Sequence, residues 1–97
     1  MSTSIQFALF VTGRNSRAER TINGVRHALK QYLDDSFNLE VFDVLANAAS
    51  AESHGVFATP TLIRLEPPPA ARVIGDLSGS GALAAALHLR ELAAEKL

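Results

Sequence analysis

Hydrophobic residues alternate along the first part of the chain in a pattern that predicts a strand. The apolar residues on one side of the segment from Ile5 to Thr12 are Ile5, Phe7, Leu9 and Val11. The other side carries Ala8 and Phe10, so both faces should be buried, as in a central strand. Gly13 ends this segment.

The spacing of apolar residues then changes to that of a helix. Residues of one apolar stripe recur every three or four positions: Ala18, Ile22, Val25, Leu29 and Leu33. This stripe predicts a helix from about residue 16 to 34. Ser16 and Glu19 match a capping box, in which both side chains satisfy free backbone N–H groups. Gly24 inside the helix should cost about 1 kcal/mol relative to alanine, and the sequence offers no local reason for it.

The remainder of the chain predicts three shorter strands and one or two helices. Leu39 to Leu45 reads as a second buried strand, and the small, polar stretch 46–57 as a short helix over about 47–54, or as a loop. Thr61–Glu66 and Arg72–Asp76 predict two more strands. The alanine- and leucine-rich C-terminal stretch predicts a helix over about 80–95. Its packing face is supplied by Leu83, Leu87 and Leu92.

This order of elements, β-α-β-(α)-β-β-α, is that of the thioredoxin-like α/β fold. The fold has a mixed four-stranded sheet, with the first two strands parallel and the last two in a hairpin, and a helix on each face. With 97 residues and no linker, the chain is expected to form a single domain over residues 1–97.

Composition narrows the possible functions. The absence of cysteine excludes disulfides, thiolate metal sites and CxxC redox chemistry. The N-terminus lacks a basic leader and a segment long enough to span a bilayer, so we expect a cytoplasmic protein that does not bind membranes. Nine basic and ten acidic residues give no overall attraction for nucleic acid.

Basic residues nevertheless gather in the segment that contains the first predicted helix. They are Arg14, Arg17, Arg20, Arg26 and Lys30, and the helix up to Lys30 has Glu19 as its one acidic residue. Two interpretations stay open: a solvated helix face, or a docking patch for an acidic protein surface.

The sequence contains no catalytic constellation. His27, His54 and His88 are far apart and have no cysteine beside them, which argues against a metal site. Asp43 and Asp76 could form a carboxylate pair, although strand-end aspartates more often cap the next element. Nucleotide-binding and nucleophile motifs are missing. We therefore expect a protein that is not an enzyme and needs no cofactor.

All four prolines lie within ten residues, around the third predicted strand. Pro60 stands just before that strand, where thioredoxin-like domains typically carry a cis-proline, so we predict a cis Thr59–Pro60 bond; a trans proline that begins the strand is the alternative. Pro67, Pro68 and Pro69 cannot donate ladder hydrogen bonds and should end the strand and stiffen the following connection.

The segment ATPTLIRLEPPPAARVIGDLS, residues 58–78, resembles the characteristic motif of the KaiB family of bacterial clock proteins. The family pattern is TPTL, a PPP run, a basic residue and IGDLS, at the mutual spacing found here. FVTGRNSRAER and LEVFDVLANAASAE also resemble family segments, and the likeness extends without gaps over about residues 7–89.

This resemblance implies a regulatory binding protein. KaiB-like proteins bind a ring-forming ATPase of the KaiC family and modulate its phosphorylation and ATPase cycle. They also switch between a thioredoxin-like monomer and a tetramer with a rearranged C-terminal half, so the tetramer-type fold is the alternative here, and a homo-dimer or homo-tetramer is possible. The alternative function is a thioredoxin-like adaptor or sensor domain that binds another signalling protein, such as a histidine kinase.

The resemblance also suggests partner-binding residues. Arg20 matches a basic position in the family, and Arg64 and Arg72 retain basic character. Glu40 and Gly55 stand where the family often has basic residues, which weakens the case for an ATPase contact of the usual polarity. We expect the partner to bind the face that carries the second strand, the 46–57 segment and both Arg64 and Arg72.

Two further positions bear on the choice of fold. Ala86 and His88 stand where the family often has a glycine and an acidic residue. Alanine favours a helix over glycine by about 1 kcal/mol. We therefore predict the thioredoxin-like form, with one uninterrupted C-terminal helix and no strand within Leu83–Leu92. The residues that we expect to influence the change of fold are Pro60, Pro67, Pro68, Pro69, Ala86 and His88.

Overall fold

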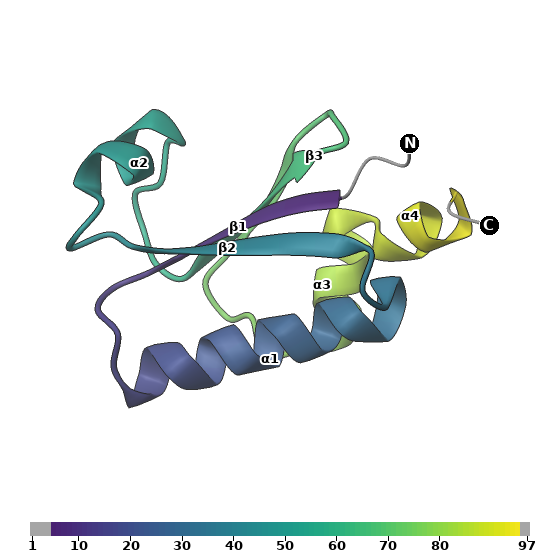
Figure 1. Ribbon diagram of the computed structural model, residues 1–97, viewed down its shortest axis with the longest axis horizontal. Helices are drawn as coiled ribbons and strands as arrows, with labels where there is room; N and C mark the ends of the chain where they lie inside the picture. The colour runs from purple at the N-terminus through teal and green to yellow at the C-terminus, as the bar shows by residue number, and fades with distance from the viewer. Residues whose placement is uncertain (1–4, 96–97) are drawn as a thin grey trace.

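The computed structural model describes residues 5–95. Its elements follow in the order β1 (Ile5–Val11), α1 (Ser16–Leu33), β2 (Phe37–Asp43), α2 (Ala48–Ser53), β3 (Thr61–Glu66), β4 (Ala71–Ile74), α3 (Ser80–Leu87) and α4 (Leu89–Glu95). Figure 1 shows α1 and α3 on one side of the sheet and α2 on the other. This is the predicted order, except that two helices stand where the sequence predicted one.

The four strands form one mixed sheet in the order β2-β1-β3-β4. β1 pairs in parallel with β2 and antiparallel with β3, so that Ala8 lies between Glu40 and Ile63. β3 and β4 form the antiparallel hairpin. Every residue of β1 except Gln6 is buried, because this strand has a neighbour at each edge and packed side chains on each face. The prediction of a buried central strand is confirmed.

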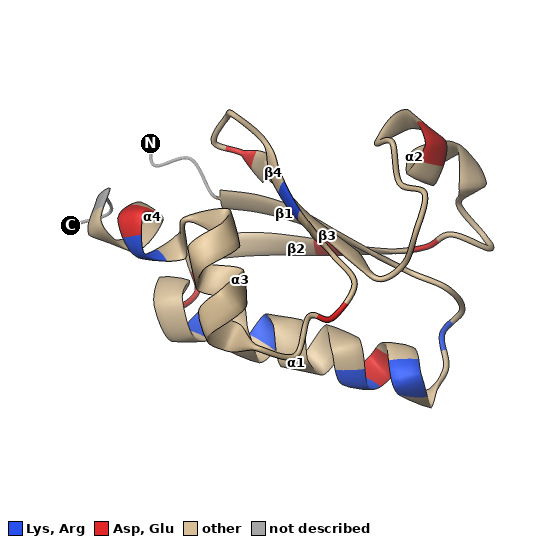
Figure 2. Cartoon of the chain, turned by 180° about the vertical axis from the view of Figure 1, so that it is seen from behind, with Lys and Arg blue, Asp and Glu red and all other residues tan. Residues whose placement is uncertain are grey.

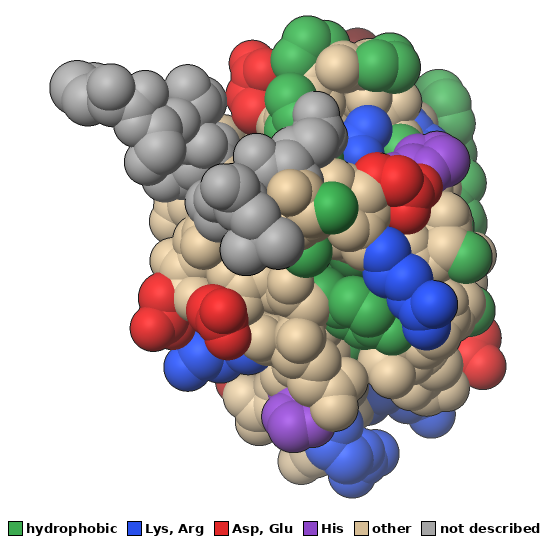
Figure 3. Space-filling view, turned by 90° about the vertical axis from the view of Figure 1, so that its right-hand side faces the viewer, with side chains coloured by type: hydrophobic (Ala, Val, Ile, Leu, Met, Phe, Trp, Pro, Cys, Tyr) green, Lys and Arg blue, Asp and Glu red, His purple; other side chains and the backbone are tan. Residues whose placement is uncertain are grey.

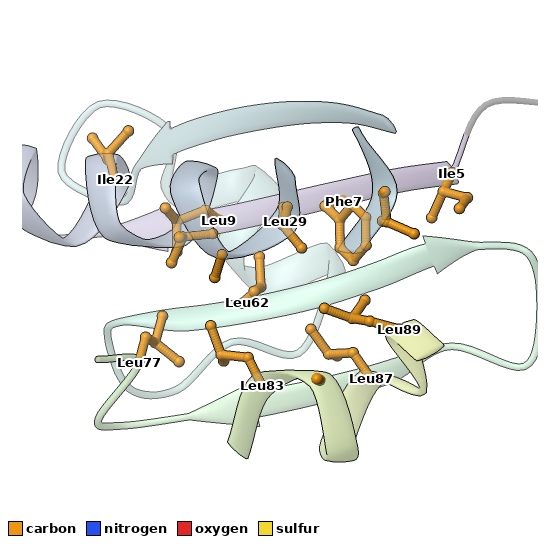
Figure 4. Close-up of a cluster of buried hydrophobic side chains, with 14 of the residues drawn as sticks. Ile5, Phe7, Leu9, Ile22, Leu29, Leu62, Leu77, Leu83, Leu87 and Leu89 are labelled. Carbon is orange, nitrogen blue, oxygen red and sulfur yellow. The ribbon is translucent and has the colours of Figure 1, made fainter. Parts of the chain in front are cut away.

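The larger core fills the space between the sheet and helices α1, α3 and α4. It contains the alternating residues of β1, the predicted stripe of α1 and leucines from the two C-terminal helices (Figure 4). Leu29, Leu87 and Leu89 have no exposed surface. Burying a leucine side chain contributes about 1.5–3 kcal/mol, so these leucines hold the C-terminal helices against α1 and the sheet.

A smaller core lies on the opposite face, under α2. Its buried members are Ala8, Phe10, Ala51 and Ile63. The six residues of α2 cover only part of this face, and the side chains of Asn38 and Glu40 in β2 are exposed. One face of the sheet is therefore fully packed and the other is partly open.

Helix α1 begins with a different cap from the one predicted. Asn15 is the N-cap, and its side-chain Oδ1 accepts a hydrogen bond from the Ala18 N–H at 2.9 Å. Glu19 pairs with Arg14 at 2.7 Å instead of completing a capping box with Ser16. The capping-box prediction was wrong for two reasons. Asparagine caps a helix as well as serine does, and the Glu19 carboxylate forms a salt bridge with Arg14.

The second strand begins and ends two residues earlier than predicted. The side chain of Asp43 stops it, because its Oδ1 accepts hydrogen bonds from the N–H groups of Gly13 and Leu45, at 2.8 and 3.0 Å. Leu45 consequently leaves the sheet and is 73% exposed. β4 likewise ends at Ile74 rather than at residue 76, since the chain turns at Gly75 with a φ of 99°.

The predicted uninterrupted C-terminal helix is broken at His88, which has left-handed φ and ψ angles of 58° and 42°. Residues two apart on a continuous helix point about 200° away from each other, so Leu87 and Leu89 could not both face the core. The break buries both of them completely. As predicted, no residue within Leu83–Leu92 is in a strand.

Candidate protein-binding surfaces

Helix α2 is fixed to the sheet by aromatic contacts. The rings of Phe10 and Phe42 are stacked with their centroids 4.9 Å apart, and the His54 ring lies 5.4 Å from Phe10 and 6.2 Å from Phe42. His54 also places its Nδ1 2.8 Å from the carbonyl oxygen of Ser50. The C-terminal end of α2 therefore has a defined position on the sheet.

Arg72 holds the loop that follows α2. Its guanidinium donates hydrogen bonds to the carbonyl oxygens of His54 and Gly55, at 2.7 and 3.0 Å. Gly55 has a φ of 66°, in the left-handed region that favours glycine. Arg72 thus ties the edge strand β4 to the α2–β3 loop, and this structural contact is an alternative to the partner contact that the sequence suggested.

Two large hydrophobic side chains are exposed on the connections that flank α2. Leu45, between β2 and α2, is 73% exposed, and Phe57, between α2 and β3, is 96% exposed. Exposed apolar side chains that gather in one patch mark protein-binding surfaces, so these two residues make the surroundings of α2 a candidate. Together with α2 and Arg72 they define what we call the α2 surface.

Sequence reasoning placed the partner on the face that carries the second strand and the 46–57 segment, which contain Leu45 and Phe57, but it singled out neither residue. The one available signal was that Phe57 stands in a small, polar stretch without apolar residues at helical spacing. Leu45 carried no such signal, because it continued the apolar run of the second strand. Glu40, which was assigned, is exposed on the same sheet face as α2, since it lies two residues from Phe42 in β2 and therefore shares its face.

Arg64 lies inside the molecule and not on the α2 surface. It is 5% exposed, and its Nη1 and Nη2 donate to the carbonyl oxygens of Leu87 and Pro69 at 2.7 and 2.8 Å. The strand register explains the difference from Arg72: Ile63 is paired with Arg72, and Arg64 with Ala71, so the two arginines point to opposite faces. In this form Arg64 is not available to a partner.

Arg20 lies on α1, on the far side of the sheet from α2. It lines a groove of about 690 Å³, which α1 forms with Thr59 and Pro60. Figure 2 shows the basic residues spaced along α1. The structure therefore divides the predicted partner-binding residues among the α2 face, the interior and the α1 side.

The prolines lie where the sequence placed them. Thr59–Pro60 is cis, as predicted, and so are Glu66–Pro67 and Pro68–Pro69. Pro67 to Pro69 are exposed in the turn between β3 and β4. Ala86 is exposed on α3, and His88 occupies the helix break with its Nδ1 3.0 Å from Glu91 Oε2. Their part in a change of fold stays a prediction.

The carboxylates considered for catalysis hold local structure instead. Asp43 binds the backbone at the ends of β1 and β2, as described above. The Oδ1 of Asp76 accepts hydrogen bonds from the hydroxyl and N–H of Ser78, at 2.6 and 2.9 Å. These bonds hold the pKa of Asp76 below its ordinary value.

Neither a metal centre nor a membrane span is evident between residues 5 and 95. The His, Asp and Glu side chains of this range form no group of three that could hold a metal ion. Within the same range, no helix combines the length and the hydrophobicity needed to cross a bilayer.

Comparison with solved structures defines the class of fold. The N-terminal domain of Synechococcus elongatus SasA superimposes with a TM-score of 0.73 at 20% sequence identity, over 95% of this chain and 87% of that domain. Thioredoxin 1 from Thermosipho africanus gives a TM-score of 0.65 at 20% identity, over 94% and 96% of the two chains. The fold is thioredoxin-like, as predicted.

Comparison of sequences identifies the family. The KaiB domain model matches residues 8–89. The circadian clock protein KaiB3 of Synechocystis sp. is 37% identical over 76 residues, which are 78% of this chain and 74% of that protein. The circadian clock oscillator protein KaiB1 of the same organism is 39% identical over 72% of this chain and 67% of its own length. The chain belongs to the KaiB family of circadian clock proteins.

Proposed function

We propose that this chain is a non-enzymatic regulatory protein of the cytoplasm that binds a KaiC-like hexameric ATPase and modulates its phosphorylation and ATPase cycle. Family membership supports the class of partner. The observation that carries the choice of surface is the exposure of Leu45 and Phe57 on either side of α2.

The α2 surface suits a protein partner for two physical reasons. Aromatic residues provide much of the binding energy of protein interfaces, and Phe57 is almost completely exposed. The contacts of His54 and Arg72 already fix α2 and its following loop, so binding requires little further ordering of that segment. Glu40 and Gly55 replace basic residues common in the family, and the contact should therefore depend more on apolar side chains than on positive charge.

The test is the affinity of purified variants for the KaiC-like ATPase of the native host. We expect Phe57→Ala to weaken binding about 30-fold, because an interface anchor is worth about 2 kcal/mol or more. Leu45→Ala should weaken it less. Arg26→Ala, an exposed change on α1, serves as the control and should leave the affinity unchanged. Unchanged affinity in both the Phe57 and Leu45 variants would show that the ATPase does not bind the α2 surface.

Co-purification from the native host separates this proposal from the adaptor function. A hexameric ATPase in the eluate, whose rates of phosphorylation and ATP hydrolysis change when the purified chain is added, supports the clock-type function. A histidine kinase recovered without any ring ATPase would overturn it in favour of the adaptor.

A further inference from the structure

Asn23 and Gly24 form a weak point in the middle of α1. Both residues are exposed, while Ile22 and Val25 on either side of them are buried in the core. Asparagine is one of the poorer helix formers, and glycine is the least favourable residue in a helix after proline. A Cβ at Gly24 would meet nothing within 4 Å, so no packing contact within residues 5–95 requires glycine here. The helix therefore contains an unfavourable pair of residues that its own packing does not explain.

Asn23 also differs from the other asparagines of the chain. The side chains of Asn15, Asn38 and Asn47 all form hydrogen bonds to other residues, whereas that of Asn23 forms none within residues 5–95. The other three asparagines are followed by serine, leucine and alanine, and Asn23 is followed by Gly24. In the part of the chain that the structure describes, Asn23 is thus the one asparagine with a free carboxamide and an unhindered neighbour.

An asparagine followed by glycine can react with its own backbone. The amide nitrogen of Gly24 attacks Cγ of Asn23, and the new N–Cγ bond closes a five-membered succinimide ring. The Cγ–Nδ2 bond breaks, and the side-chain nitrogen leaves as ammonia with the proton of the attacking N–H. Water then opens the ring at either carbonyl carbon, which leaves aspartate or isoaspartate at position 23. Glycine favours ring closure because it has no Cβ to hinder the attacking nitrogen.

The closed helix holds the reacting groups apart. In a helix the N–H of Gly24 donates to the carbonyl four residues earlier, and ring closure requires the ψ angle of Asn23 to leave its helical value of about −42°. Both conditions are met only when this part of α1 opens. Native proteins open locally at a lower free energy than that of global unfolding, and the weak helix formers at positions 23 and 24 lower the cost of opening there. The rate of the reaction is therefore set by how often the middle of α1 opens.

We propose that Asn23 is a self-modification site, at which opening of α1 converts asparagine to aspartate or isoaspartate. The two products affect the helix differently. Aspartate adds a negative charge one turn from Arg26, at a spacing where opposite charges stabilise a helix. Isoaspartate lengthens the backbone by a carbon atom and interrupts the hydrogen bonds of α1 between the buried Ile22 and Val25. No residue of the α2 surface takes part, so the site goes beyond the proposed function and does not depend on it.

Peptide mapping of the full chain by mass spectrometry tests the proposal. The chain is incubated at neutral pH, folded in one sample and unfolded by guanidinium chloride in the other, and the products at each asparagine position are measured over time. We expect product at Asn23 in the folded sample while the other asparagines stay intact. The unfolded sample should react about tenfold faster or more, because no opening is required. Equal product at the other asparagines, or none at Asn23 in the folded sample after several weeks, would overturn the proposal.

Three variants separate the chemistry from the opening of the helix. Gly24→Ala should slow the reaction about tenfold in the unfolded chain, since a Cβ hinders the attacking nitrogen, and further in the folded chain, since alanine strengthens the helix. Asn15→Ala removes the N-cap of α1 and should speed the reaction about fivefold in the folded chain alone. An unchanged folded rate in this variant would show that opening of α1 does not control the reaction. Asn23→Asp, which carries one product, should keep the melting temperature of the original chain, and a lower value would contradict the stabilising position beside Arg26.

Discussion

Arg64 and Arg72 each donate hydrogen bonds to two backbone carbonyls, but they do so in different environments. Arg64 is buried, has no carboxylate partner among the described residues, and leaves its Nε unpaired. A buried guanidinium is tolerated only because its hydrogen bonds replace those to water. Its acceptors are Leu87 at the helix break and Pro69 in the proline turn, so one side chain connects two irregular segments.

Removing Arg64 should therefore destabilise the fold more than removing Arg72. We expect Arg64→Ala to lower the free energy of unfolding by about 2–4 kcal/mol, because the buried carbonyl of Leu87 and the part-buried carbonyl of Pro69 lose a charged donor. Arg72→Ala also removes two bonds to carbonyls, but these are exposed to water, and the loss should be about 1 kcal/mol or less. Urea denaturation of both variants measures the difference. Equal losses in the free energy of unfolding would show that the burial of Arg64 does not make its hydrogen bonds more stabilising than those of Arg72.

The lowered pKa of Asp76 gives a pH prediction. Because the folded-state pKa lies below the unfolded value, the carboxylate stabilises the fold above the unfolded pKa of about 4, and this contribution is lost as the pH falls through the lowered folded pKa. An NMR titration should find Asp76 ionised further into acid than a model peptide. Ser78→Ala should raise this pKa towards its ordinary value, since it removes the hydroxyl donor. A pKa that does not move in the variant would contradict the assignment.

At the level of elements, the helix break shows how packing overrides local preference. The alanines at positions 82, 84, 85 and 86 favour a continuous helix. The structure instead turns at His88, and thereby buries both Leu87 and Leu89. The free carbonyl of Leu87 then accepts from Arg64. Burial of one additional leucine can outweigh the cost of a single left-handed residue, which is about 1–2 kcal/mol.

Leu89→Ala distinguishes the broken helix from a continuous one. In the broken form Leu89 has no exposed surface, so the change should lower the free energy of unfolding by about 2–5 kcal/mol. Leu45→Ala is the matched control, because Leu45 is 73% exposed, and it should change stability by less than about 0.5 kcal/mol. A small loss for Leu89→Ala in thermal or urea unfolding would point to one continuous helix.

Local patterns were enough to predict the order and type of the strands and of α1, but they left 46–57 open between helix and loop and missed the break between α3 and α4. Period-two and period-3.6 spacing placed β1 and α1. The cis Thr59–Pro60 bond was predicted from the place of Pro60 before the third strand, where thioredoxin-like domains typically carry a cis-proline. Features that depend on distant residues could not be predicted in this way. The burial of Arg64 follows from the β3–β4 register, and the exposure of Leu45 from the bonds that Asp43 makes to Gly13 and Leu45.

The whole molecule has two candidate binding surfaces, separated by the sheet. The α2 surface is marked by exposed hydrophobic residues, and the groove beside α1 by Arg17 and Arg20, which form no ion pair with other residues between 5 and 95. At the end of the molecule seen in Figure 3, acidic and basic side chains are interspersed instead of separated by sign. The sides of the molecule thus differ in the kinds of side chain that they expose.

The absence of cysteine leads to a prediction about activity. Disulfide exchange requires a thiolate as the nucleophile, and this thioredoxin-like chain has none. In an insulin reduction assay with dithiothreitol, we expect the rate to equal the rate without protein. The thioredoxin of Thermosipho africanus serves as the positive control. Any rate above background would require a chemistry that the side chains described above do not provide.

The central position of β1 has a consequence for how the chain is made. Its sequence IQFALFV has no charge and no proline, which are the properties of segments that aggregate when they are exposed. One edge of β1 pairs with β2. The other edge pairs with β3, which follows more than fifty residues later in the sequence, as in the pairing of Ala8 with Ile63. During synthesis on the ribosome, β1 therefore keeps an unpaired edge until residue 66 has emerged, and we expect the nascent chain to be most prone to aggregation in that interval.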